Sequence, residues 1–123
     1  MAGPDSYVAF ALDSANLQGE VAFLTDGQLS GLCNKGLTVA EVSPESAVGG
    51  PISLVTNGDT ITIDVDRRIP DLEVSEAELA ARRSSFGEPV LPRATGYLSI
   101  YQRTVQPMSK GAVLVCDTSD DKA

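Results

Sequence analysis

Turn-forming residues break this sequence into short segments, and that spacing limits what the chain can fold into. Eleven glycines and seven prolines are spread over 123 residues. The longest apolar stretches, Tyr7–Leu12 and Ala112–Cys116, reach about a third of the ~20 residues that a membrane-spanning helix needs. With 42% apolar residues, the chain has enough material for one compact core. We therefore predict a single domain over residues 1–123 with no membrane segment.

Several segments carry helix signals. Residues 6–16 place apolar side chains on one side, with Ser6 as the expected cap. Ser75 and Glu78 form a capping box that predicts a helix through about Phe86. Residues 43–47 predict a single helical turn, with Ser43 as its cap and Pro44 at its first position. Residues 97–105 fit a helix by apolar spacing and a strand by β-branched content, so both alternatives stay open.

Strand signals are more numerous, but each is short. Buried or alternating apolar patterns mark residues 21–25, 37–42, 60–66 and 111–115, with 72–74 as the expected partner of 60–66 and 52–55 as a further apolar run. These segments follow no regular strand–helix alternation. The sequence therefore predicts an α+β fold with a mixed, barrel-like sheet.

Composition excludes several classes of function. The formal charge of −8 opposes nucleic-acid binding, because that binding depends on neutralising phosphates. The sequence contains no histidine, which excludes a Ser-His-Asp triad or a His-based zinc site within this chain. Its two cysteines, Cys33 and Cys116, are too few for a four-cysteine metal site. The N-terminus lacks the basic start and cleavage site of a secretory signal, which predicts a soluble, cytoplasmic protein.

The segment Thr25–Gly36 carries the strongest functional signal. It is a long loop with three glycines between two predicted strands, and long loops within compact domains are often functional. Glycines also let backbone amides approach a ligand. By spacing alone, a binding site and a plain connection are equally supported. Ser30 has no histidine to deprotonate it and reads as a turn residue, while Cys33 is either a small half-buried residue or a reactive thiol.

A series of short motifs runs in order along the chain: Thr25-Asp26-Gly27-Gln28-Leu29-Ser30-Gly31, Glu41-Val42-Ser43-Pro44-Glu45, Gly49-Gly50-Pro51-Ile52, Asn57-Gly58-Asp59, Arg82-Arg83 and Ser109-Lys110-Gly111-Ala112. In this order and spacing they resemble the C-terminal domain of the dihydroxy-acid dehydratase / 6-phosphogluconate dehydratase family. The family pattern reads TDGRFSG or TDGRMSG, then HVSPEA, GGPI, DGD, ARR and SKGA. The resemblance covers nearly the whole chain.

This resemblance implies a fold, a reaction and partners. The expected fold is a swivelling β/β/α domain, a small barrel-like sheet flanked by helices, like the mobile domain of aconitase. The expected activity is that of a hydro-lyase, which dehydrates 2,3-dihydroxy acids or sugar acids (aldonates) to 2-oxo acids. In the family, an Fe–S cluster and Mg²⁺ sit mainly in a large N-terminal domain that this chain lacks, so the isolated chain is expected to be inactive and to bind neither. The expected partners are that Fe–S domain or subunit, a small polyhydroxy acid and, in the full enzyme, a second copy in a homodimer.

The resemblance also assigns roles in the loop. Ser30 occupies the place of the serine that takes the C2 proton of the substrate as an alkoxide. Asp26, Gly27, Gln28 and Gly31 form the substrate-binding loop around it. Gln28 stands where the family has arginine, which changes the expected contacts to a substrate carboxylate or phosphate.

Metal ligands are sparse in this chain. Asp5 aligns with a metal-binding glutamate of the family and is assigned as a Mg²⁺ ligand, although it lies closer to Ser30 in sequence than the family spacing. Neither Cys33 nor Cys116 corresponds to a cluster ligand. Positive charge from the metals of the other domain would let Ser30 act as a base without a histidine.

Two hypotheses of different classes stay open. In the first, the chain is the catalytic-loop part of a dehydratase. In the second, it is a truncated, stand-alone domain of the same fold that serves in binding or assembly. Three cluster cysteines encoded upstream of Met1 or in an adjacent gene would favour the first.

Overall fold

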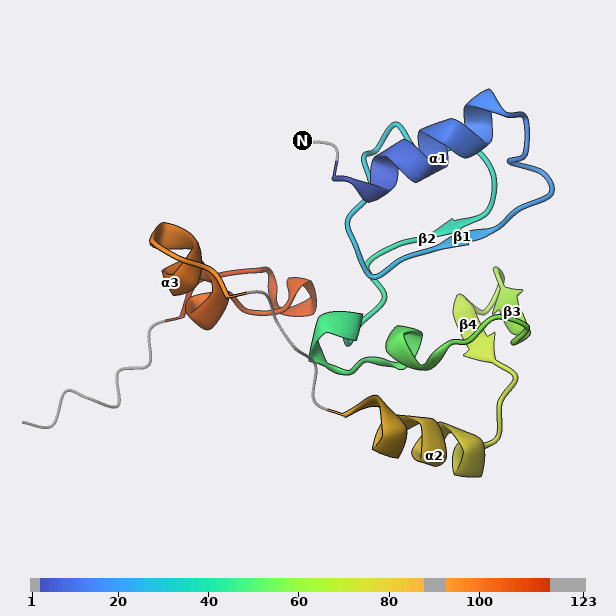
Figure 1. Cartoon of the computed structure of the whole chain (residues 1–123). Coiled ribbons are helices and arrows are strands. Elements are labelled where there is room, and N and C mark those ends of the chain that lie inside the picture. The colour runs from blue at the N-terminus through green and yellow to red at the C-terminus, as the bar shows by residue number, and fades with distance from the viewer. Residues whose placement is uncertain (1–2, 88–92, 116–123) are drawn as a thin grey trace, which may run out of the picture. The chain divides into compact units, whose positions relative to one another are not determined.

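A computed structural model of the chain describes residues 3–87 and 93–115. The chain divides into two compact units, Met1–Pro89 and Val90–Ala123. The first unit contains the elements from α1 to α2, and the second contains α3 (Figure 1). Within the two described ranges, no helix combines the length and the apolar character needed to cross a membrane.

Helix α1 spans Asp5–Ser14 and confirms the helix predicted over residues 6–16. It begins one residue early because Pro4 precedes it, with a φ of −52° that suits a helix start. The prediction that Ser6 caps this helix is wrong. Ser6 lies within the first turn with 0% of its surface exposed, and its hydroxyl accepts a hydrogen bond from a distant loop.

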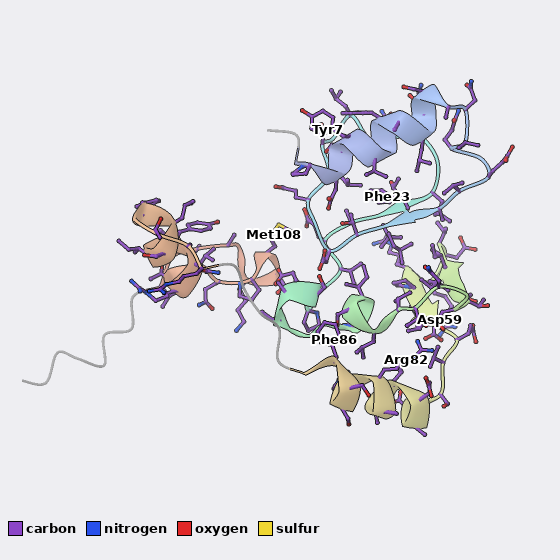
Figure 2. The ribbon with its side chains drawn as sticks, viewed as in Figure 1. Tyr7, Phe23, Asp59, Arg82, Phe86 and Met108 are labelled. Atoms are coloured by element: carbon purple, nitrogen blue, oxygen red, sulfur yellow. The ribbon has the colours of Figure 1, made fainter. Side chains whose placement is uncertain are left out.

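Two short strands follow α1. Strand β1 (Phe23–Leu24) and strand β2 (Thr38–Val39) pair in parallel, with Phe23 opposite Thr38. Both lie within the predicted segments 21–25 and 37–42, and both are shorter than predicted. Helix α1 runs alongside this pair (Figure 1), with Tyr7 projecting from the helix and Phe23 from β1 (Figure 2). Residues 25–37 between the strands form neither helix nor strand, which confirms the predicted long loop.

The chain next forms two 3-10 helices, η1 (Ser46–Val48) and η2 (Pro51–Leu54). Helix η1 confirms a helical turn near the predicted position, but Glu45 before it is extended, so Pro44 is not its first residue. The apolar run over residues 52–55 belongs largely to η2 and not to a strand. Pro51 is compatible with this difference, because its ring fixes a φ that suits the first position of a helix and it has no N–H for a sheet.

A hairpin follows η2. Strand β3 (Ile61–Asp64) pairs antiparallel with strand β4 (Ile69–Leu72), with Ile61 opposite Leu72. Strand β4 shares only Leu72 with the predicted partner at 72–74. The prediction stopped short of Pro70, which an edge strand tolerates. The predicted alternation holds over Ile61, Thr62 and Ile63, where the two isoleucines are half-buried and the threonine is exposed, but it ends at Asp64, which is half-buried as well. Val65 lies beyond β3 and is 65% exposed.

Helix α2 spans Glu76–Phe86, as its capping box predicts. The Ser75 hydroxyl accepts a hydrogen bond from the Glu78 amide at 3.2 Å. The Glu78 carboxylate does not complete the box at Ser75. It accepts a hydrogen bond from Arg82 Nε at 2.9 Å, which joins two neighbours on one side of the helix.

The second unit contains helix α3 (Tyr97–Thr104) and the 3-10 helix η3 (Met108–Lys110), where Met108 is labelled in Figure 2. Helix α3 decides the ambiguity over residues 97–105 in favour of a helix. The predicted strand at 111–115 is reduced to one antiparallel bridge, between Val105 and Leu114. Cys116 and the polar tail predicted after it lie outside the described residues.

The apolar centre of the first unit is small. Leu54 on η2 is 3% exposed and is the one buried apolar side chain in the described part of the chain. An apolar pocket beside β1, η2 and the β3–β4 hairpin is lined by residues that include Leu24, Ile52 and Ile61. The strands form two separate two-stranded sheets. The α+β class is therefore confirmed, and a closed barrel is not among the described elements.

Candidate functional site

Backbone hydrogen bonds hold the first residues of the loop between β1 and β2. Thr25 is 8% exposed, and its amide donates to the Val39 carbonyl at 3.0 Å. The Thr25 carbonyl accepts from the Val42 amide at 3.2 Å, and the Gly27 carbonyl accepts from the Glu41 amide at 3.1 Å. These backbone bonds continue the pairing of the two strands into the first residues of the loop.

Asp5 lies against the start of this loop. The Thr25 hydroxyl donates to Asp5 Oδ2 at 2.5 Å and accepts from the Gly27 amide at 2.9 Å. A Cβ atom added to Gly27 would overlap the Asp5 carboxylate. Glycine at position 27 therefore permits the close approach, and the structure brings together two of the residues that the sequence assigned to the site.

Ser30 is half-buried and is held through its backbone. Its amide donates to Ser6 Oγ at 2.9 Å, and its carbonyl accepts from the Cys33 amide at 2.9 Å. Its side-chain oxygen, Oγ, accepts a longer hydrogen bond from the Leu32 amide at 3.3 Å. The candidate base thus sits on a turn that is anchored to α1, with a backbone N–H directed at its hydroxyl oxygen.

Asp26 connects the loop to η1. Its Oδ2 atom accepts hydrogen bonds from the Ser46 amide at 2.6 Å and from the Ser46 hydroxyl at 2.5 Å. The hydroxyl bond, and then the amide bond, hold the pKa of the Asp26 carboxyl below its usual value of 3.8. Asp26 is therefore an ionised link between two segments as well as a predicted member of the substrate-binding loop.

The far side of the loop is open. Gln28 and Gly31 are both exposed. A Cβ atom added to Gly31 would meet no other atom within 4 Å, whereas one added to Gly3 would come within 2.8 Å of the Gln28 carbonyl oxygen. The loop therefore packs near Gln28 against Gly3, which precedes α1, and faces open space at Gly31, immediately after Ser30.

Charged and metal-binding groups are few around Ser30. Lys35, a cation of the loop, pairs with Asp13 at 2.9 Å. Within residues 3–87 and 93–115, no cluster of three or more His, Cys, Asp or Glu side chains is arranged to hold a metal ion. Cys33 is a free, half-buried thiol whose Sγ lies 4.0 Å from the Ser6 carbonyl oxygen, which supports its interpretation as a small packed residue. Asp5 is thus a single carboxylate beside the loop.

Sequence reasoning missed two residues that hold the loop, Ser6 and Ser46. Ser6 directly precedes the apolar residues of the predicted helix, where a cap is expected, and this expectation hid its long-range role. Ser46 is 20 residues from Asp26, and the sequence carries no signal that pairs them. These residues define a class of site in which a serine lies on a glycine-containing loop of an α+β domain. The backbone of that serine is anchored to a helix.

Comparison with known proteins specifies this class. Residues 6–112 match the family model described as dihydroxy-acid/6-phosphogluconate dehydratase C-terminal. The chain is 46% identical over 103 residues to a dihydroxy-acid dehydratase of Synechococcus sp. (strain CC9902), covering 84% of this chain and 18% of that protein. It is 49% identical over 104 residues to the dihydroxy-acid dehydratase of Thermosynechococcus vestitus, with coverages of 84% and 18%. A third dihydroxy-acid dehydratase, from Methanothrix thermoacetophila, is 46% identical over 104 residues, covering 85% of this chain and 19% of that protein.

The chain therefore belongs to the dihydroxy-acid/6-phosphogluconate dehydratase family and corresponds to its C-terminal domain. It spans less than a fifth of the length of the curated relatives it matches. The family resemblance that the motif series indicated is thus confirmed. The loop that carries Ser30 lies within the matched region.

Proposed function

We propose that this chain is the catalytic-loop part of a hydro-lyase that converts 2,3-dihydroxy acids or sugar acids to 2-oxo acids, with Ser30 as the base. One observation carries the proposal: Ser30 is anchored through its amide to buried Ser6, and the residue is half-buried directly before the open face at Gly31. A base needs a fixed backbone and an accessible oxygen. The family match supports the reaction class.

A metal site shared with another domain fits the residues present. Mg²⁺ prefers oxygen ligands, commonly uses one or two carboxylates and keeps several waters. Asp5 supplies one such carboxylate, and in the described structure Thr25 Oγ1 donates to one of its oxygens and orients it. When bound, Mg²⁺ would neutralise charge on the substrate carboxylate, and an Fe–S cluster would act as a Lewis acid toward a leaving hydroxyl. We assign the cluster ligands to an N-terminal Fe–S domain or subunit.

The residues of this chain then move one proton. Ser30 Oγ, as an alkoxide, takes the proton from C2 of the substrate, and the C2–H electron pair forms the C2–C3 double bond of the enol as the C3 hydroxyl departs. The Ser30 hydroxyl then returns that proton to the departing hydroxyl, which leaves as water and restores the alkoxide. The resulting enol tautomerises to the 2-oxo acid, so one substrate gives one product and one water. The Leu32 amide donates to Ser30 Oγ at 3.3 Å, and a donor at that oxygen favours its anionic form.

We infer that the groups in residues 3–87 and 93–115 do not suffice to deprotonate Ser30. A hydroxyl is a weak base unless positive charge lies close to it. Lys35 is already paired with Asp13. We therefore propose that the isolated chain is inactive and that activity needs the metal charge of the N-terminal domain. In the full enzyme, this chain would form the swivelling, barrel-like domain. The full enzyme would be a homodimer.

The experiment combines this chain with the large Fe–S half, reconstitutes cluster and Mg²⁺, and follows 2-oxo acid formation from a panel of 2,3-dihydroxy acids and aldonic acids. We expect activity with at least one substrate, and a loss of at least a hundredfold in the Ser30→Ala variant. Ser14→Ala, at the exposed end of α1, is the matched control and should keep full activity. Full activity of Ser30→Ala would contradict the assigned role.

The second candidate is a binding or assembly domain without catalysis. It is favoured by the small apolar centre, because exposed apolar side chains such as Tyr7 at 72% and Leu32 at 76% suit contact with another protein. If the chain binds a partner but no combination with an Fe–S half yields 2-oxo acid, this candidate replaces the first.

A further inference from the structure

We infer that Ser6 is a positioning residue for Ser30, an inference that rests on the proposed function. Ser6 lies in the first turn of α1, and Ser30 lies 24 residues further along the chain. The Ser6 hydroxyl oxygen accepts the hydrogen bond of the Ser30 amide at 2.9 Å. This contact links the helix directly to the residue whose side chain is the candidate base.

The burial of Ser6 makes this contact specific. Its exposed fraction is 0%. A buried polar atom costs free energy unless it is hydrogen-bonded. The hydrogen bond from the Ser30 amide therefore explains why a buried serine is tolerated at position 6. By comparison, Ser14 at the other end of the same helix is exposed.

Further contacts hold the same turn against the same loop. Asp5 accepts from the Thr25 hydroxyl, and the Ser6 carbonyl oxygen lies 4.0 Å from Cys33 Sγ. The loop is therefore held before Ser30, at Ser30 and after it. Of these contacts from the first turn of α1, only the Ser6 hydroxyl binds Ser30, and it binds the backbone amide of Ser30 and not its side chain.

The position of an anchored backbone determines where the side-chain oxygen can reach. Loss of the Ser6 hydroxyl leaves the Ser30 amide without this acceptor, so the turn gains freedom and Oγ samples positions away from the C2 proton. A misplacement of about 1 Å can slow an enzymatic step on the order of a hundredfold. We expect the effect in kcat, with little change in KM, because Ser6 does not face the open side of the loop where substrate would bind.

Two variants separate the hydrogen bond from the volume of the side chain. Ser6→Ala removes the acceptor and leaves a small gap. Ser6→Cys fills the space with a sulfur that is a weak acceptor. Ser14→Ala serves as the control in α1. If Ser6→Ala prevents folding, the comparison of Ser6→Cys with the unmodified chain decides the question.

The first measurement is amide hydrogen exchange on this chain, which requires no activity. We expect the Ser30 amide to exchange at least tenfold faster in both Ser6 variants, with amides of α2 and of the β3–β4 hairpin unchanged. The second measurement is kcat and KM after combination with the Fe–S half, where we expect kcat to fall on the order of tenfold to a hundredfold. Unchanged exchange or an unchanged kcat in the Ser6 variants, or full restoration of both in Ser6→Cys, would overturn the inference.

Ser30→Ala distinguishes this inference from the proposed function. That variant keeps the residue-30 amide, so its exchange should stay slow while activity is lost. If Ser30→Ala is fully active, the proposed base is wrong, whatever the exchange data show. If Ser30→Ala is inactive and the Ser6 variants keep full kcat, the proposed base stands and the positioning role of Ser6 is wrong.

Discussion

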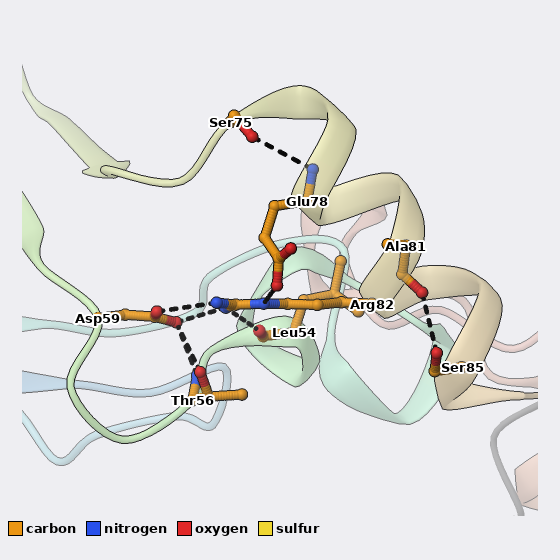
Figure 3. Close-up of polar contacts among 8 residues, drawn as sticks. All are labelled: Leu54, Thr56, Asp59, Ser75, Glu78, Ala81, Arg82 and Ser85. Carbon is orange, nitrogen blue, oxygen red and sulfur yellow. Dashed lines mark hydrogen bonds and ion pairs between the residues drawn. The ribbon is translucent and has the colours of Figure 1, made fainter.

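Arg82 on α2 and Asp59, in the turn before β3, are joined by two hydrogen bonds in a fork: Nη1 to Oδ2 at 2.6 Å and Nη2 to Oδ1 at 3.0 Å. Arg82 Nη1 also donates to the Leu54 carbonyl at 3.0 Å, and Nε donates to Glu78 (Figure 3). One guanidinium therefore connects α2 to η2 and to the hairpin, next to the one buried apolar side chain of the described structure.

Replacement of Arg82 by lysine should destabilise the first unit. A lysine ammonium has no planar fork and cannot make the paired contact with Asp59 while it also reaches the Leu54 carbonyl. We expect the melting temperature to fall by several degrees in Arg82→Lys. Arg83→Lys, on an exposed neighbour in the same helix, should leave it unchanged. Equal melting temperatures for the two variants would show that the fork contributes nothing measurable.

The same pair predicts a dependence of stability on pH. The hydrogen bonds from Arg82, followed by that from the Thr56 amide, lower the pKa of Asp59 from 3.8 to about 2. A carboxyl with a lowered pKa in the folded state stabilises that state above its unfolded pKa and loses this contribution as pH falls toward its folded pKa. We expect the stability difference between the natural chain and Asp59→Asn to be constant above pH 5 and to shrink between about pH 4 and pH 2. Urea titrations across this range measure it, and a difference that does not change with pH would contradict it.

Local patterns predicted the elements that depend on neighbours in sequence. Ser75 marked the start of α2 because its hydroxyl satisfies the Glu78 amide within one turn. Apolar spacing favoured a helix at residues 97–105, and helix α3 forms over most of that segment. The short 3-10 helix at Pro51 was not predicted, because a four-residue apolar run has no period that distinguishes strand from helix.

The residues of the candidate site that belong to a sequence motif were predictable. The contacts between side chains that are distant in sequence were not. The Asp26–Gly31 motif and the position of Asp5 came from the ordered pattern, and the structure places Asp5 beside Gly27. The contacts of Ser6 with Ser30 and of Ser46 with Asp26 join residues 24 and 20 positions apart. Such contacts are set by packing in three dimensions, which a single sequence does not encode in any local spacing.

Gly27 and Gly31 should respond differently to alanine. A Cβ atom at Gly27 would overlap the Asp5 carboxylate, whereas one at Gly31 meets open space. We expect Gly27→Ala to cost about 1–3 kcal/mol of unfolding free energy, as overpacking does, and Gly31→Ala to change it by less than about 0.5 kcal/mol. Chemical denaturation of the two variants measures both values. A stable Gly27→Ala variant would show that Asp5 does not have to lie against the loop.

Activity adds a second readout for this glycine pair. Gly31 directly follows Ser30 on the exposed side of the loop. In the reconstituted enzyme, we expect Gly31→Ala to lower kcat/KM about tenfold or more while stability is retained, because a methyl group there enters the space proposed for the substrate. Unchanged kcat/KM in this variant would place the substrate elsewhere.

The link between Asp26 and Ser46 gives the final prediction. The Ser46 hydroxyl is the leading cause of the lowered Asp26 pKa, and the Ser46 amide is the next. Ser46→Ala removes the hydroxyl and keeps the amide, so we expect the Asp26 pKa to rise toward 3.8 without fully reaching it. Because this carboxyl is partly exposed, the lost bond should cost about 1 kcal/mol of unfolding free energy near neutral pH.

The sign of its pH dependence follows from linkage. The contribution of this bond is present above pH 3.8 and fades as the pH falls through the lower pKa of the folded state. Ser46→Ala and the natural chain should therefore differ near pH 7 and converge in acid. Carboxyl NMR titration of Asp26 in the two proteins tests the pKa, with Ser85→Ala on α2 as the control, since Ser85 donates only within its own helix at 3.1 Å. An Asp26 pKa that is the same in Ser46→Ala and in the natural chain would mean that η1 does not hold this loop through the serine hydroxyl.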